Sequence, residues 1–80
     1  MSDLKLTEIQ EPLSFRRVRF KLEAAGFNEI KQLGNHAKFV KRKNGQIITA
    51  ILPHYQELSV PVVRSIIRQA RMTKSEFDQY

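Results

Sequence analysis

Two histidines, His36 and His54, are the side chains best suited to acid–base chemistry in this sequence of 80 residues. A histidine titrates closest to neutral pH, so one imidazole can serve either as an acid or as a base. His36 follows the dipeptide Gly34-Asn35 and precedes Lys38 by two positions, whereas His54 follows a proline. On residue type alone, a surface histidine without a catalytic role remains the alternative for both.

Basic side chains are concentrated in the middle of the chain. Residues 12–74 contain thirteen lysines and arginines against three glutamates, a net charge of +10, whereas residues 1–11 and 75–80 each carry −2. Positive charges at this density repel one another, and binding to a polyanion relieves that repulsion. RNA, DNA, an acidic protein and an anionic membrane surface are all compatible partners, and a merely solvated basic surface is the alternative.

The sequence lacks the residues that several other kinds of functional site require. There is no cysteine, and two histidines eighteen positions apart do not form a zinc site. The sequence has no glycine-rich phosphate loop, no paired carboxylates in its basic part and only serines that suit capping or helix-face positions. We therefore expect no metal or other cofactor, which leaves imidazole chemistry on RNA or binding alone.

Targeting signals are equally scarce. The longest uncharged run, Asn44–Gln56, is far shorter than the roughly 18 apolar residues of a membrane span. The N-terminus contains acidic residues and no apolar core, unlike a secretory signal. We expect a cytoplasmic protein that does not enter the membrane.

Periodicity and turn residues divide the chain into few elements. Ser14 is a suitable helix N-cap, and Gly26 can take the left-handed conformation that ends a helix. Asn44-Gly45 is typical of a two-residue type I′ hairpin turn. The expected elements are a flexible acidic arm at 1–11, a helix at 14–25, strands at 27–33, 36–43 and 46–52, a helix from about residue 61, and a capping box that opens a last turn at 73–77.

Two features of these elements concern the surface. Arg64, Arg68 and Arg71 repeat opposite the apolar stripe of the second helix, which predicts a basic ridge along it. The strand at 46–52 is apolar on both faces, with Ile47 on one and Ile48 on the other. Either both faces are covered within the chain or one of them awaits a partner. We expect both to be covered within the chain, because a chain this short can form only a small core.

A helix, three antiparallel strands and a second helix predict a two-layer α+β sandwich in a single domain at 12–80. This is the architecture of double-stranded RNA-binding domains. If the helices cover one face of the sheet, strand alternation directs Ala37 and Phe39 toward them. His36 and Lys38 then point to the open face or to an edge.

Five segments, in order along the chain, carry a closer likeness: Leu22–Phe27, Gly34–Phe39, Asn44–Gln46, Arg64–Ala70 and Ser75–Phe77. They resemble the HicA family of bacterial toxins over roughly residues 15–77. The resemblance implies a domain of the double-stranded RNA-binding type that cleaves messenger RNA without a metal and is inhibited by a partner HicB antitoxin. It also implies that His36 is the catalytic histidine, although the family usually has serine where this chain has Asn35.

The remaining expected site residues follow from this assignment. Lys38, on the same strand face as His36, can neutralise the scissile phosphate. His54 is a candidate second acid or base. The expected RNA contacts are Asn35, Lys38, Lys41, Arg42, Lys43, Arg64 and Arg68. The alternative is a non-catalytic RNA- or protein-binding module on the same fold. The sequence does not determine the oligomeric state, so a homo-oligomer is also compatible with it.

Overall fold

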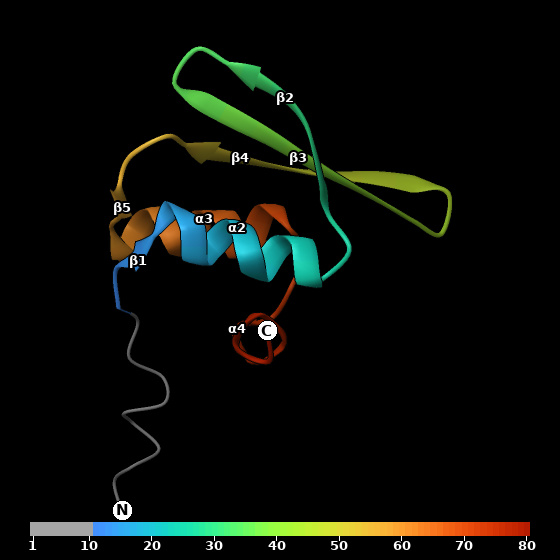
Figure 1. Ribbon diagram of the computed structural model, residues 1–80. Helices are drawn as coiled ribbons and strands as arrows, with labels where there is room; N and C mark the ends of the chain where they lie inside the picture. The colour runs from blue at the N-terminus through green and yellow to red at the C-terminus, as the bar shows by residue number, and fades with distance from the viewer. Residues whose placement is uncertain (1–10) are drawn as a thin grey trace, which may run out of the picture.

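The computed structural model describes residues 11–80, with residues 32 and 33 described by their backbone alone, so the arm expected at 1–11 lies outside the described residues except for Glu11. The elements, in chain order, are β1 (Leu13–Ser14), α2 (Phe15–Ala24), β2 (Asn28–Leu33), β3 (His36–Lys43), β4 (Gln46–Pro53), β5 (Glu57–Leu58), α3 (Val60–Gln69) and α4 (Lys74–Asp78). The expected order of helix, three strands and helix is confirmed (Figure 1).

Helix α2 begins and ends at the residues that the sequence predicted. The Oγ of Ser14 accepts a hydrogen bond from the backbone N–H of Arg17 at 3.0 Å, which caps the first turn. Gly26 has φ of 104°, and the N–H of Phe27 reaches back to the carbonyl of Leu22 at 2.9 Å. This is the Schellman arrangement, which needs a left-handed residue after the helix.

Two tight turns fix the register of the three-stranded antiparallel sheet, whose order is β2-β3-β4. Asn44 and Gly45 have φ of 51° and 78°, as the expected type I′ turn requires. At the other end of β3, Gly34 has φ of 61° and the turn closes where Leu33 pairs with His36. Since both ends of β3 are held, the face of each of its side chains is determined.

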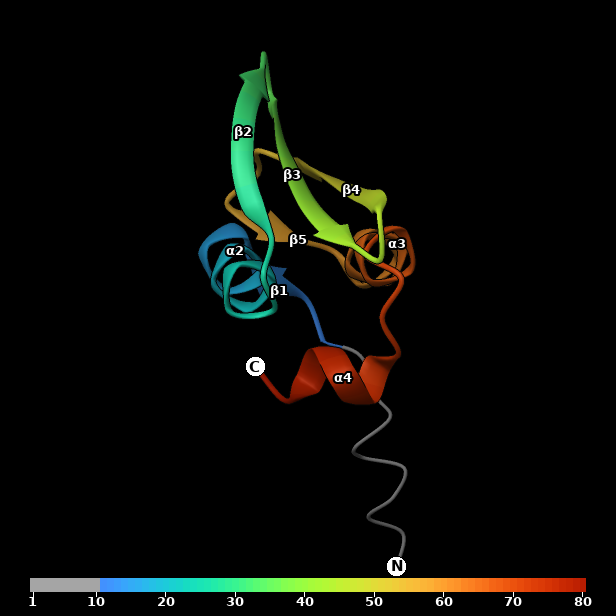
Figure 2. The same cartoon turned by 90° about the vertical axis from the view of Figure 1, so that its right-hand side faces the viewer.

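Helices α2 and α3 lie on one face of the sheet and make the second layer of an α+β sandwich (Figures 1 and 2). Ala37 and Phe39 of β3 are fully buried beneath them, as alternation predicted. The core also contains Val18 and Leu22 from α2, Ile48, Ala50 and Leu52 from β4, and Val63, Ile66, Ile67 and Ala70 from α3.

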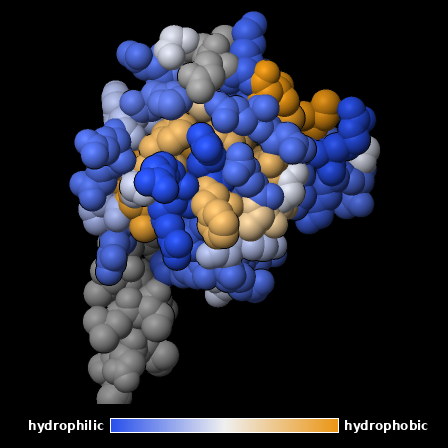
Figure 3. Space-filling view, viewed as in Figure 1, coloured by the Kyte–Doolittle hydropathy of each residue, from blue (hydrophilic) through white to orange (hydrophobic). Residues whose placement is uncertain are grey.

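The expectation that both faces of β4 are covered within the chain is not met by residues 11–80, which cover one face alone. Ile47 is 58% exposed and Ile51 half-buried, on the face opposite Ile48. The reason is that α2 and α3 both pack on the same side of the sheet, and no other element between residues 11 and 80 reaches the second face. In Figure 3 apolar surface is visible over the end of the sheet that carries the β3–β4 turn.

A second, two-stranded sheet was not expected. Leu13 of β1 pairs with Leu58 of β5, and the N–H of Phe15 donates to the carbonyl of Gln56 at 3.1 Å. Strands of two residues leave no periodic signal in a sequence. The pairing ties the start of α2 to the chain that follows β4.

Helix α3 ends earlier than the expected basic ridge requires. Arg71 has φ of 58° and lies beyond the helix, where the N–H of Met72 bonds to the carbonyl of Ile67 at 3.2 Å. Arg71 thus takes the left-handed position of a Schellman motif, usually a glycine. Its Nη1 donates to Oε1 of Gln46 at 3.0 Å, so the ridge on α3 contains Arg64 and Arg68 alone.

A short terminal helix is attached through one aromatic ring and one buried lysine. The capping box at Thr73 and Glu76 is confirmed, and Phe77 is 1% exposed. The Nζ of Lys21 donates to the carbonyls of Phe77 and Tyr80 at 3.3 and 3.0 Å. Burial, reinforced by the positive charge of Arg17, lowers the pKa of Lys21 below its usual value.

None of the helices within residues 11–80 is long and apolar enough to cross a membrane.

Replacing Phe77 by alanine should lower the free energy of unfolding by about 3–5 kcal/mol, because it empties the contact that holds α4 against the core. Urea denaturation followed by circular dichroism measures this change. Phe20→Ala is the matched control: its ring is 57% exposed, so its loss should change stability by less than about 0.5 kcal/mol. Equal effects of the two substitutions would contradict the packing of α4.

Candidate functional site

His36 occupies the first position of β3, immediately after the Gly34-Asn35 turn, and its side chain is exposed. It pairs across the sheet with Pro53. The carbonyl of Asn35 accepts a hydrogen bond from the N–H of His54 at 2.6 Å, which ties the turn to the chain leaving β4. The imidazole therefore stands on a fixed strand end in contact with solvent.

Further cations share the open face of the sheet with His36. Lys38 and Arg42 lie two and six positions after it along β3, with Val40 between them, and Lys31 of β2 pairs directly with Lys38. Side chains two positions apart on a strand are separated by about 7 Å, so one extended phosphodiester backbone can contact several of them. Lys31 was not among the expected site residues, although a two-residue turn at 34–35 places residue 31 opposite residue 38.

None of these cations forms an ion pair with a carboxylate of the described residues. Within residues 11–80 the ion pairs lie elsewhere, where Arg19 meets Glu23 at 3.8 Å and Lys74 meets Asp78 at 2.6 Å. In this part of the chain the open face therefore carries an excess of positive charge, which favours an anionic ligand.

Apolar side chains alternate with the cations on this face. Across the sheet, Lys38 lies opposite Ile51 and Arg42 lies opposite the exposed Ile47. The open face is thus basic and apolar at once, which suits a partner that offers both kinds of contact.

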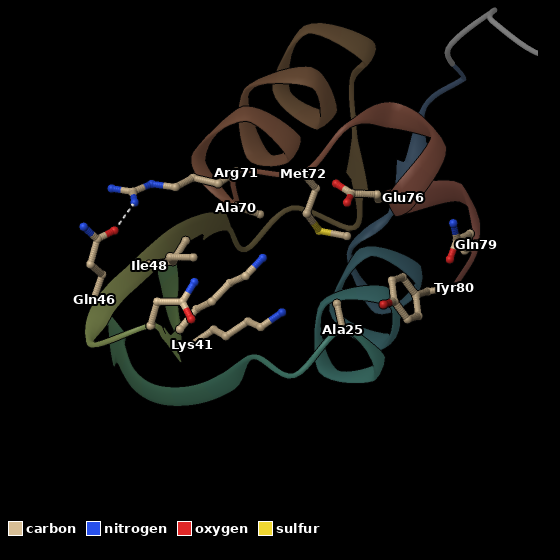
Figure 4. Close-up of a pocket in the computed structure, with 12 residues that line it drawn as sticks. Ala25, Lys41, Gln46, Ile48, Ala70, Arg71, Met72, Glu76, Gln79 and Tyr80 are labelled. Atoms are coloured by element: carbon tan, nitrogen blue, oxygen red, sulfur yellow. Dashed lines mark hydrogen bonds between the residues drawn. The ribbon is translucent and has the colours of Figure 1, made fainter.

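Lys41 and Lys43, expected to bind RNA together with Arg42, project from the other face of β3. They line a pocket of about 440 Å³ between the β3–β4 turn, the end of α3 and α4. Figure 4 shows Lys41 extending into this pocket, with Arg71 bonded to Gln46 at its rim. The Nζ of Lys41 lies 5.7 Å from the ring centre of Phe27, which belongs to the helix-covered side. Strand alternation thus separates three consecutive basic residues.

Arg64 and Arg68 form a third basic surface on α3. Both are exposed, and they border a groove of about 300 Å³ with Ile67, Met72 and Lys74. Because α3 lies under the helix-covered side of the sheet, these arginines do not join the face that carries His36.

His54 is close to His36 along the backbone, but its ring has a different environment. It stacks on Phe15 of α2 with ring centroids 4.3 Å apart and an interplanar angle of 22°. The neighbouring Pro53 pairs with His36, so His54 points to the helix side by alternation. The structure therefore brings the two histidines to one end of the sheet without placing them on one face.

No three acidic or histidine side chains within residues 11–80 come close enough to hold a metal ion.

Comparison with known families identifies one match that spans most of the fold. A family model described as the HicA toxin of bacterial toxin–antitoxin matches residues 15–72, from the first residue of α2 to the residue after Arg71. The matched region includes the three-stranded sheet and His36. Comparison with curated proteins gives no match.

The stacking of His54 on Phe15 should appear in proton NMR spectra. Ring currents from Phe15 should shift the imidazole protons of His54 upfield, whereas those of the exposed His36 should lie near their random-coil positions. In Phe15→Leu the His54 signals should move toward random coil. Identical His54 shifts in the parent and the variant would show that the rings do not stack.

Proposed function

Because the chain belongs to the HicA toxin family of bacterial toxin–antitoxin systems, we propose that it is a metal-independent endoribonuclease that cleaves messenger RNA through His36. We further propose that a HicB-like antitoxin restrains it. The observation that carries the proposal is one exposed imidazole, fixed at the end of β3, at the head of a row of cations.

The chemistry needs few groups. The 2′-hydroxyl oxygen of the RNA attacks the adjacent phosphorus, the bond from phosphorus to the 5′ oxygen breaks, and one proton is removed while another is supplied. An imidazole near neutral pH can perform either transfer, and such catalysis contributes typically 10²–10⁴-fold. The products would carry a 2′,3′-cyclic phosphate and a 5′-hydroxyl.

Lys38 is proposed to stabilise the negative charge that accumulates on the phosphorane, because it is the cation next to His36 on the same strand face. Asn35 can donate a hydrogen bond to the same phosphate from the turn. Lys31 and Arg42 extend the cationic row and would hold the phosphates on either side. The RNA backbone is thus proposed to follow the open face of the sheet.

The other expected contacts take secondary roles in this proposal. Lys41 and Lys43, with Arg64 and Arg68, face other directions and would attract RNA at long range. His54, whose ring rests on Phe15, is proposed to assist less than His36 does.

The antitoxin is proposed to cover the open face. Ile47 and Ile51 offer apolar area beside Lys38 and Arg42, so the partner should present acidic side chains around an apolar centre. Binding there would block the phosphate path directly.

His36→Ala should abolish cleavage of a long messenger RNA in buffer containing EDTA, with a loss of at least about 10²-fold in rate. The exposed side chain makes no core contact, so circular dichroism and the melting temperature should not change. His54→Ala is the matched control and should slow cleavage less.

Three outcomes decide this test. Cleavage by His36→Ala at the parent rate would exclude His36 as the catalyst. Binding of RNA by the parent with no cleavage would favour a non-catalytic binding module. Activity that disappears with EDTA would reject the metal-independent mechanism.

Arg42→Ala should weaken RNA binding more than Lys43→Ala, although the two residues are adjacent. Arg42 shares the face of His36, whereas Lys43 lines the pocket on the other side. Fluorescence anisotropy over a range of salt concentrations should show a slope lowered by about one counterion for Arg42→Ala. Equal slopes for both variants would mean that RNA does not follow the open face.

A further inference from the structure

Helix α2 carries a basic and aromatic hollow that the proposed site does not include. It has a volume of about 540 Å³ and lies where α2 begins, beside the connection between β4 and β5. Its lining consists of Ser14, Phe15, Arg16, Arg17, Phe20 and Gln56.

The exposure of Phe20 is the first unexplained feature of this hollow. Its side chain is 57% exposed, whereas Phe15 on the same helix is 7% exposed and belongs to the core. A phenylalanine on a polar helix surface contributes little to stability, but its ring offers a flat apolar face to a ligand. Phe20 is therefore available for stacking.

Two arginines adjoin that ring. Arg16 and Arg17 precede Phe20 by four and three residues, and side chains at these spacings are neighbours on a helix surface. Within residues 11–80 neither guanidinium has a carboxylate partner, whereas Arg19 on the same helix pairs with Glu23. The hollow thus combines an aromatic face with two free cations, the combination that binds single-stranded nucleic acid.

The hollow is connected to the end of the sheet that carries His36. Phe15 forms part of its lining and stacks on His54 at 4.3 Å. The N–H of His54 bonds to the carbonyl of Asn35, the residue before His36. Two successive contacts and one peptide bond therefore lead from the hollow to the strand end that carries His36.

We propose that this hollow binds an unpaired nucleotide of the RNA next to the cleaved bond, with its base on Phe20 and its phosphates on Arg16 and Arg17. The inference deepens the proposed function and rests on it. A base can stack on a side chain only when it has left its own helix. An unstacked nucleotide also has the freedom to align its 2′-hydroxyl with the departing oxygen, so such a subsite would favour single-stranded RNA at the cleavage position.

The test measures binding of single-stranded RNA oligonucleotides to the full chain carrying His36→Ala, which keeps the RNA intact. Phe20→Ala should weaken binding about tenfold, within the range that base–aromatic stacking gives, whereas Phe20→Tyr should bind as the parent does. Anisotropy at fixed salt reports the affinity. Because Phe20 is exposed, its substitution should leave the fold intact, which circular dichroism checks.

Oligonucleotides with one abasic position identify the stacked base. At one position next to the cleaved bond, removal of the base should weaken binding to the His36→Ala chain about tenfold and leave binding to the Phe20→Ala double variant unchanged. Such non-additivity is expected only where ring and base touch.

The arginines have a matched control on the same helix. Arg16→Ala and Arg17→Ala should each lower the salt slope of RNA binding by about one counterion. Arg19→Ala makes the same change of charge outside the hollow, next to Glu23, and should lower the slope less.

The outcomes separate this inference from the proposed function. Unchanged affinity in Phe20→Ala, or additive effects at every abasic position, would overturn the subsite and leave His36 as the proposed catalyst. Absence of cleavage by the parent would overturn the proposed function, while the binding measurements still decide the subsite. A loss of antitoxin affinity in Phe20→Ala without a loss of RNA affinity would assign the hollow to the protein partner and reject the inference.

Discussion

The register of β3 is the constraint on which the rest of the molecule depends. The turns at residues 34–35 and 44–45 hold both ends of this central strand, so each of its side chains has one available face. A shift by one residue would move Phe39 into solvent and His36 under the helices. Burial of Phe39 and Ala37 stabilises the register that exposes His36.

That register divides the positive charge into separate surfaces. Lys38 and Arg42 stay with His36 on the open face, while Lys41 and Lys43 face the pocket near α4. A net charge of +10 over residues 12–74 therefore does not act as one basic patch. The open face combines charge with exposed isoleucine, and the other surfaces offer charge without the histidine.

The small β1–β5 sheet links the helix layer to the end of the larger sheet that carries His36. It fixes the start of α2 beside the chain that leaves β4, so that Phe15, which lines the hollow around Phe20, stacks on His54. HicA membership accounts for the common fold over residues 15–72.

Local signals in the sequence determined the elements: Ser14 and Gly26 bound α2, Asn44-Gly45 sets a hairpin, and alternation assigns Phe39 to the core. These predictions are confirmed because helix capping, positive φ and strand alternation depend on residues that are close together in the sequence.

Only the tertiary structure decided which sheet face stayed open, that Arg71 leaves the α3 ridge, and that His54 rests on Phe15. Those outcomes depend on where two helices pack and on contacts between residues far apart in the chain. No periodicity in the sequence encodes such contacts, because they form only when the helix layer packs against the sheet.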